Sequence, residues 1–143
     1  MSVIAWDGKT LAADKQATYG YTAGTTTKIW KIGDRLIGGV GTHAYVHAVL
    51  NWLTGEMHAE DFPHAPKEDA EKFAVWVITR DGTITRFENS PYPVLILDKK
   101  WADGSGGEVA MGAMEMGASA AKAAEIACRH DIHCGMGVDT LTF

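Results

Sequence analysis

Short apolar runs separated by turn-forming residues predict a series of strands at the start of the chain. These strands alternate apolar and polar positions, are joined through Gly-containing turns, and cover residues 2–6, 10–13, 26–32 and 35–40. The Asp7-Gly8 dipeptide is typical of a tight hairpin between the first two. Residues 16–24 are polar and rich in Gly and Thr, so they predict a loop.

Apolar residues then recur at helical spacing in three segments. These segments are expected helices and cover residues 42–53, about 108–116 and about 119–130. Thr42 can cap the first of them and Gly55 can end it. Residues 56–70 carry two Pro and many charges, which predicts a surface loop with at most one helical turn. The remaining expected strands cover residues 73–79, 83–88, 94–97 and 135–142.

The order of these elements is strands, a helix, strands, two helices and a last strand. It predicts an α+β domain with helices packed on sheets rather than alternating βαβ units. A chain of 143 residues is long enough for one domain with a real core, so residues 1–143 are expected to form a single domain. The apolar share of 46% and charged share of 22% are those of an ordinary globular protein.

Charge and hydropathy exclude two classes of partner. The net charge is −5 and no basic cluster offsets it, which argues against nucleic-acid binding. The apolar runs are too short to span a bilayer, and no signal peptide or leader is expected. Cys128 and Cys134 are therefore expected to be reduced thiols in a cytoplasmic protein without membrane or nucleic-acid partners.

Candidate chemistry lies at the N-terminus. Removing Met1 would give Ser2 a free α-amine beside its hydroxyl, which are the parts of an N-terminal nucleophile. An α-amine has a pKa of about 7.7–8.0, so it can accept the hydroxyl proton near neutral pH in place of a triad histidine. A Lys anchored by a carboxylate would keep that amine neutral, and Lys28 with Asp14 are the candidates.

The segment SVIAWDGKTLAADKQATYG, followed by TTKIWKI, resembles the start of proteasome β-type proteins, nearest to the HslV-like peptidases. That family opens with a nucleophilic Thr, ends its second strand in an (A/G)-D-x-x-A-T motif and places a Lys in the third. Residues 13–18, ADKQAT, match the second element, and Lys28 matches the third. The resemblance continues in GSGG at 104–107 and D-x-x-C-G at 131–135, so it covers most of the chain.

The resemblance implies a four-layer αββα sandwich of two antiparallel sheets and an N-terminal-nucleophile peptidase that works as a self-compartmentalising ring. It implies a polypeptide substrate, copies of the same chain as partners, and no cofactor or metal. HslV also depends on an unfolding ATPase; this chain has no nucleotide motif, so that ATPase would be a separate protein. The start of the chain also looks like short proteasome-like proteins encoded by phages and prophages.

The resemblance further implies a set of site residues, namely Ser2, Asp14, Lys28, Gly41, Ser105, Asp131 and Cys134. In the family, the group at Ser2 attacks, Lys28 held by Asp14 tunes it, and the Gly41 N–H stabilises the oxyanion. Ser105 and Asp131 match groups that flank the nucleophile's amine and relay protons.

The sequence departs from the family at three positions. Ser2 replaces Thr, and the missing methyl leaves its rotamer freer. Cys134 replaces a Ser and is a weaker hydrogen-bond partner. Gly41-Thr42 stands where the family often has two glycines. These departures support a second hypothesis, a catalytically inactive ring or scaffold protein of the same fold.

Other interpretations of these residues stay open. Aligning the start on Ala5 would place Met1 at the nucleophile position instead of Ser2. Taken singly, Asp14 is typical of a strand end, Lys28 of a solvated strand lysine, and Gly41 of a strand-to-helix turn.

Two histidine groups favour a third hypothesis, a metal-binding protein. His43 and His47 share one face of the expected helix, although Ala44 occupies the place of the zincin Glu. A second group, crowded into seven residues without the usual zinc spacing, consists of Cys128, His130, His133 and Cys134.

Overall fold

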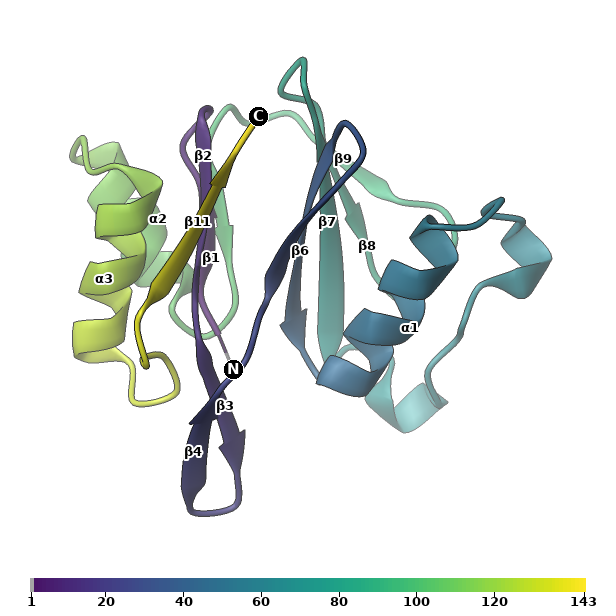
Figure 1. Cartoon of the computed structure of the whole chain (residues 1–143), viewed down its shortest axis with the longest axis horizontal. Helices are drawn as coiled ribbons and strands as arrows, with labels where there is room; N and C mark the ends of the chain where they lie inside the picture. The colour runs from purple at the N-terminus through teal and green to yellow at the C-terminus, as the bar shows by residue number, and fades with distance from the viewer. Residues whose placement is uncertain (1) are drawn as a thin grey trace.

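The computed structural model describes residues 2–143 and has two antiparallel β-sheets stacked face to face between helices (Figure 1). The first sheet has the order β10-β1-β2-β11 and comprises β10 (Trp101–Asp103), β1 (Ile4–Trp6), β2 (Thr10–Asp14) and β11 (Val138–Thr142). The second sheet has its strands in sequence order and comprises β5 (Ile29–Ile32), β6 (Arg35–Gly41), β7 (Phe73–Thr79), β8 (Ile84–Phe87) and β9 (Val94–Ile96).

Helices cover both outer faces of this sheet pair. Helices α2 (Gly107–Glu115) and α3 (Ala120–His130) lie on the first sheet, and α1 (His43–Leu53) lies on the second (Figure 1). The expected α+β, four-layer αββα sandwich is confirmed.

Alternation along β1 explains why the first sheet is buried on both faces. Val3 and Ala5 face the helices α2 and α3, whereas Ile4 and Trp6 face the second sheet. The helix side of this interface is built largely from alanines, which allow close packing, and its fully buried members include Ala110, Ala120, Ala123, Ala124 and Ala127. Removing this apolar surface from water is what drives the layers together.

On the other side of the molecule, α1 packs on the second sheet through larger side chains. Val46, Val49 and Leu53 of the helix contact strand residues such as Ile37 and Val75. The helix approaches β6 so closely that a Cβ at position 39 would lie 2.1 Å from Val46 Cγ1, which explains the glycine found there. This contact brings the N-terminal end of α1 against the last residue of β6.

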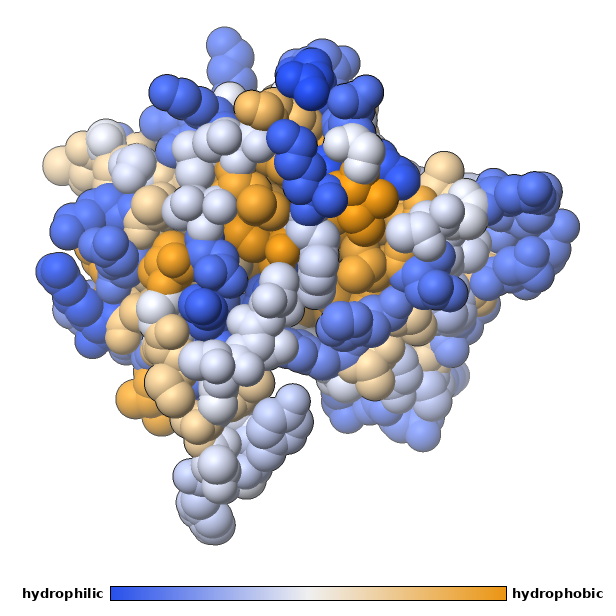
Figure 2. Space-filling model, in the orientation of Figure 1, coloured by the Kyte–Doolittle hydropathy of each residue, from blue (hydrophilic) through white to orange (hydrophobic). Residues whose placement is uncertain are grey.

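The expected loop at residues 16–24 is wrong. This segment forms a hairpin of β3 (Gln16–Tyr19) and β4 (Thr22–Thr25), which projects from the body of the molecule (Figure 1). Its two strands pair only with each other, and their side chains are mostly exposed, so the segment lacks the buried apolar face by which a strand is predicted. In the space-filling view the projecting hairpin is pale, which marks residues of intermediate hydropathy (Figure 2).

Two other elements differ from the sequence expectations. The segment expected as a loop at 56–70 contains two short 3-10 helices, η1 (Ala59–Asp61) and η2 (Lys67–Asp69). Strand β10 was not expected, because WAD lies between charged and Gly-rich residues and becomes a strand only by pairing with β1. Across the described residues 2–143, no helix combines the length and the apolar character needed to cross a membrane.

Candidate active site

Ser2 lies directly before β1, and its backbone is held by the segment that precedes α2. The Ser2 N–H donates to Ser105 Oγ at 3.2 Å, and the Ser2 carbonyl accepts from Ser105 Oγ at 3.4 Å and from the Gly106 N–H at 3.1 Å. Gly104 passes so near that a Cβ there would lie 2.2 Å from the Ser2 carbonyl oxygen, and its φ of +91° also requires glycine. Residues 103 positions apart in the sequence thus meet at the start of the chain.

Asp14, at the end of β2, accepts hydrogen bonds on both carboxylate oxygens. Its Oδ1 accepts from Lys28 Nζ at 2.8 Å and from the Val3 N–H at 3.0 Å. Its Oδ2 accepts from the Gln16 and Gly135 N–H groups, both at 3.1 Å. The carboxylate therefore joins Lys28 directly to the residue that follows Ser2.

Lys28 and Asp14 form a buried ion pair, with only 1% and 0% of the side chains exposed. Because burial of an unpaired charge is very costly, the pairing explains how the lysine is tolerated in the core. The interpretation of Lys28 as a solvated strand lysine is wrong. Its carbonyl also accepts from the Gly39 N–H at 3.0 Å, which ties its position to β6.

A second chain of polar groups runs from Ser105 toward Asp131. Ser105 Oγ lies 3.9 Å from Cys134 Sγ, and the Cys134 thiol donates to Asp131 Oδ2 at 3.3 Å. The other oxygen of Asp131 accepts from the His133 N–H at 2.8 Å. The structure thus brings Ser105, Cys134 and Asp131 to the same side of Ser2.

Burial and hydrogen bonding shift the pKa values in this second chain. Burial, helped by the nearby Asp14 carboxylate, raises the pKa of the Cys134 thiol to about 12, so the group stays protonated at neutral pH. Burial also opposes ionisation of Asp131, but hydrogen bonds from Ser105, His133 and Cys134 outweigh it and lower the pKa of Asp131. The pair is therefore a neutral thiol donating to a carboxylate.

Gly41 ends β6 at the junction with α1. Its φ is +94°, and a Cβ would lie 1.9 Å from the Lys72 carbonyl oxygen, so only glycine fits. Backbone N–H groups alternate between the two sides of an antiparallel strand. The Gly39 N–H donates toward Lys28 and the Thr42 N–H toward Lys72, so the Gly41 N–H points to the Lys28 side.

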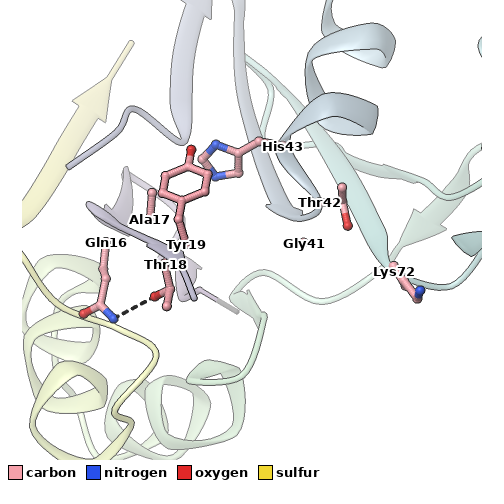
Figure 3. Close-up of a pocket in the computed structure, with 8 residues that line it drawn as sticks. All are labelled: Gln16, Ala17, Thr18, Tyr19, Gly41, Thr42, His43 and Lys72. Atoms are coloured by element: carbon pink, nitrogen blue, oxygen red, sulfur yellow. Dashed lines mark hydrogen bonds between the residues drawn. The ribbon is translucent and has the colours of Figure 1, made fainter. Parts of the chain in front are cut away.

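A cleft of about 470 Å³ opens beside Gly41. One wall is β3 and the other is the strand-to-helix junction, and the lining residues are Gln16, Ala17, Thr18, Tyr19, Gly41, Thr42, His43 and Lys72 (Figure 3). In the space-filling view a hollow separates the projecting hairpin from the α1 half of the molecule (Figure 2). Ser2, Asp14 and Lys28 do not line this cleft; they are buried.

Sequence reasoning did not find Tyr19, Lys72 or the hairpin wall of this cleft. It singled out His43 only as a metal ligand, because the sequence pattern reveals its helical partner His47 but not β3. The cleft exists only because the hairpin, the end of β6 and the residue before β7 meet in the folded chain. No local sequence signal marks such a meeting.

The structure does not assemble the metal ligands that the sequence suggested. Within residues 2–143, no group of three or more His, Cys, Asp or Glu side chains is placed to hold a metal ion. The rings of His43 and His47 are 6.2 Å apart, and Cys134 donates to Asp131 instead of joining the neighbouring histidines.

Comparison with known proteins places this geometry in a structural context. No family model matches the sequence, and no curated protein sequence matches it. Among solved structures, BPH of Thiobacillus denitrificans is similar with a TM-score of 0.68 and 19% identity, over 99% of this chain and 96% of that one. HslV of Trypanosoma brucei is similar with a TM-score of 0.64 and 19% identity, over 98% and 97%.

A third structure, a mutant of Anbu from Hyphomicrobium sp. strain MC1, gives a TM-score of 0.69 at 12% identity, over 100% of this chain and 81% of that one. The chain has the HslV-like, proteasome-type fold. At these identities the likeness establishes the fold and leaves the chemistry to this chain's own residues. Those residues place Ser2 between the Asp14–Lys28 pair and Ser105.

Proposed function

We propose that this protein is an N-terminal-nucleophile hydrolase, a peptidase of the proteasome and HslV type, with Ser2 as its nucleophile. The observation that carries the proposal is the buried pair of Lys28 and Asp14, bonded to the Val3 N–H directly beside Ser2. A buried charge pair contributes little to stability compared with apolar packing, so its presence here favours a functional role.

The proposed reaction begins once Met1 has been removed and the Ser2 amine is free. The Lys28 ammonium disfavours a second positive charge nearby, which keeps the amine neutral, and it lowers the pKa of the hydroxyl. The amine takes the hydroxyl proton while Ser2 Oγ attacks the peptide carbonyl carbon. The Gly41 N–H stabilises the resulting oxyanion, a contribution of about 3–4 kcal/mol to the barrier.

The intermediate then collapses with return of the proton. The Ser2 ammonium gives its proton to the leaving amine, the C–N bond breaks, and the acyl group stays on Ser2 Oγ as an ester. Water, deprotonated by the same amine, hydrolyses the ester and restores Ser2. Ser105, with Cys134 and Asp131 behind it, orients the amine, since Ser105 Oγ is 3.2 Å from Ser2 N.

The proposal extends to assembly. Copies of this chain would form a ring that encloses the sites, and a separate ATPase unfoldase would deliver polypeptide to them; both follow from the family resemblance. Light scattering at micromolar concentration is expected to give a closed oligomer. A monomer under those conditions would remove the ring from the proposal and leave the chemistry at Ser2 to be tested separately.

Intact mass and a covalent probe test the catalytic proposal. Because a solved structure of BPH is a complex with epoxomicin, a peptide epoxyketone of that kind is a suitable probe. Protein that lacks Met1 is expected to gain one probe mass at Ser2. Protein that retains Met1, and the Ser2→Ala variant, are expected to gain none. Ser2→Thr is expected to react at least as fast, because the added methyl restricts the rotamer.

A catalytically inactive ring or scaffold is the second candidate. Two observations favour it: Ser2 is only 1% exposed, and a thiol with a raised pKa occupies the Cys134 position. If the assembled protein lacks Met1 and still reacts with no covalent probe, the result would support the inactive scaffold.

A further inference from the structure

The lining of the cleft beside Gly41 differs in composition from the rest of the protein. The whole chain carries a net charge of −5, yet no carboxylate is among the residues that line the cleft. Its lining includes two basic side chains, His43 on the α1 wall and Lys72 at the edge. A lining that holds a protonatable imidazole and no carboxylate favours an anionic ligand group over a cationic one at that place.

The charged groups packed near His43 leave its imidazole available to a ligand. The Lys28 ammonium lies close enough to His43 to lower its pKa, and the Asp14 carboxylate opposes that effect. The Asp14 carboxylate is already engaged by Lys28 Nζ and three backbone N–H groups. The His43 side of the cleft therefore lacks an available carboxylate partner.

At the Lys72 end the charges are more nearly balanced. Lys72 Nζ is bonded to Asp69, whose other oxygen accepts from the Tyr45 hydroxyl at 2.8 Å, and Glu68 lies close enough to interact. The Lys72 ammonium is thus already paired, and His43 is the lining group best placed to meet a ligand anion.

We propose that this cleft binds an acidic side chain, Glu or Asp, on the substrate residue whose carbonyl is attacked. The inference rests on the proposed function, since it takes the Gly41 N–H as the oxyanion donor. A carbonyl held at Gly41 places the side chain of the same residue next to the segment from Gly41 to His43, which forms one wall of the cleft (Figure 3). The volume of about 470 Å³ is ample for a Glu side chain.

The imidazole of His43 gives this selectivity a pH dependence. Burial lowers the pKa of His43, and the nearby charges of Lys28 and His47 lower it further, so the free cleft holds a neutral ring at pH 8. A bound carboxylate favours the protonated ring. Preference for Glu over its uncharged isostere Gln is therefore expected to grow as the pH falls from 8 to 6.

Two peptides that differ only in Glu or Gln before the cleaved bond test this in the assembled protein lacking Met1. The ratio of their kcat/KM values cancels the chemistry common to both, including titration of the Ser2 amine. We expect the Glu peptide to be favoured about tenfold at pH 6, the size of one hydrogen bond to a charged group, and less at pH 8. A ratio near one at both pH values, with both peptides cleaved, would overturn the inference and leave the proposed function intact.

Matched variants assign the effect to His43. His43→Gln is expected to bring the ratio close to one and to remove its pH dependence. His130 lies at the exposed end of α3, on the other side of the sheet pair. His130→Gln is therefore expected to keep both the preference for the Glu peptide and its pH dependence. Equal ratios in the two variants would exclude His43 as the selecting group.

A binding measurement keeps the inference testable without catalysis. In the Ser2→Ala protein, NMR titration of the imidazole signals is expected to show the pKa of His43 rising when a Glu peptide amide is added and staying unchanged with the Gln peptide amide. If neither peptide moves it, the acidic preference is wrong even for an inactive protein. If Glu binds but the processed wild type cleaves neither peptide, the catalytic proposal alone fails.

Discussion

The two polar arms that meet at Ser2 are built very differently. On one side, Lys28 and Asp14 are buried, 2.8 Å apart, and every oxygen of the carboxylate has donors. On the other side, Ser105 is exposed, and its contact to the Cys134 sulfur is 3.9 Å. The first arm depends on a charge pair in the core, whereas the second runs from an exposed hydroxyl to a buried neutral thiol through longer contacts.

This difference indicates where the protein tolerates change. A buried charge that loses its partner has no solvent to replace it, so the first arm must stay intact for both folding and chemistry. In the second arm, the exposed Ser105 hydroxyl can exchange its partner for water at small cost, and the buried Cys134 thiol carries no charge that needs a partner. Asp14 and Lys28 make up the first arm, and the uncharged Cys134 lies in the second.

Breaking the first arm is expected to have the largest effect. Lys28→Ala leaves the Asp14 carboxylate buried without a cation, so the free energy of unfolding should fall by about 3–5 kcal/mol, and labelling by epoxomicin should be lost. Urea denaturation and intact mass measure the two effects. The matched control is Lys31→Ala. Lys31 is an exposed lysine of β5 whose Nζ donates to the Thr142 carbonyl at 3.2 Å, so this variant should change the free energy of unfolding and the labelling little. Labelling that persists in Lys28→Ala would argue against its role.

The support of Ser2 by the segment before α2 gives the next largest effect. Gly104→Ala places a Cβ 2.2 Å from the Ser2 carbonyl oxygen at a φ of +91°, which should cost about 1–3 kcal/mol and slow labelling by moving Ser2. Gly112→Ala in α2 meets no atom within 4 Å and should instead stabilise the helix by about 0.5–1 kcal/mol. Similar melting shifts of the same sign in both variants would contradict this account.

Within the second arm, the substitution at Cys134 is expected to matter less. Cys134→Ser restores a stronger hydrogen-bond donor toward Asp131 and should raise the labelling rate by less than about tenfold. Cys134→Ala removes the donor and should lower the rate by a similar factor. If the alanine variant reacts as fast as the serine variant, the second arm has no part in orienting the amine.

The smallest effect concerns the thiols themselves. Burial raises the pKa of Cys134 to about 12 and that of Cys128 to about 11, so both should react slowly with iodoacetamide at pH 8 until the protein is unfolded. A raised folded-state pKa stabilises the fold below the unfolded thiol pKa of about 8.5, and this contribution is lost as the pH rises toward the folded value. The stability difference between wild type and Cys134→Ser should therefore change between pH 8 and 10. Rapid alkylation of the native protein would refute the burial argument.

Much of the architecture could be predicted from local pattern. Strands such as β6 and β7 and all three helices lie close to their expected positions, because alternation and helical spacing report directly which face of an element is buried. The hairpin of β3 and β4 could not be predicted in this way, since it buries little and is held by its own backbone pairing. Strand β10 likewise has three residues and depends on β1.

By itself, the sequence determined the order of the layers and the residue types available for chemistry near Ser2. Only the tertiary structure decided that Asp14 and Lys28 are buried together and that Ser105 reaches Ser2. It also decided that His43 faces β3 across a cleft. The physical reason is the distance along the chain over which each property is set. Which side chains of a strand or helix are buried is a local property of that element. A buried charge pair or a cleft instead forms only where segments distant in the chain meet, and that follows from the packing of the two sheets.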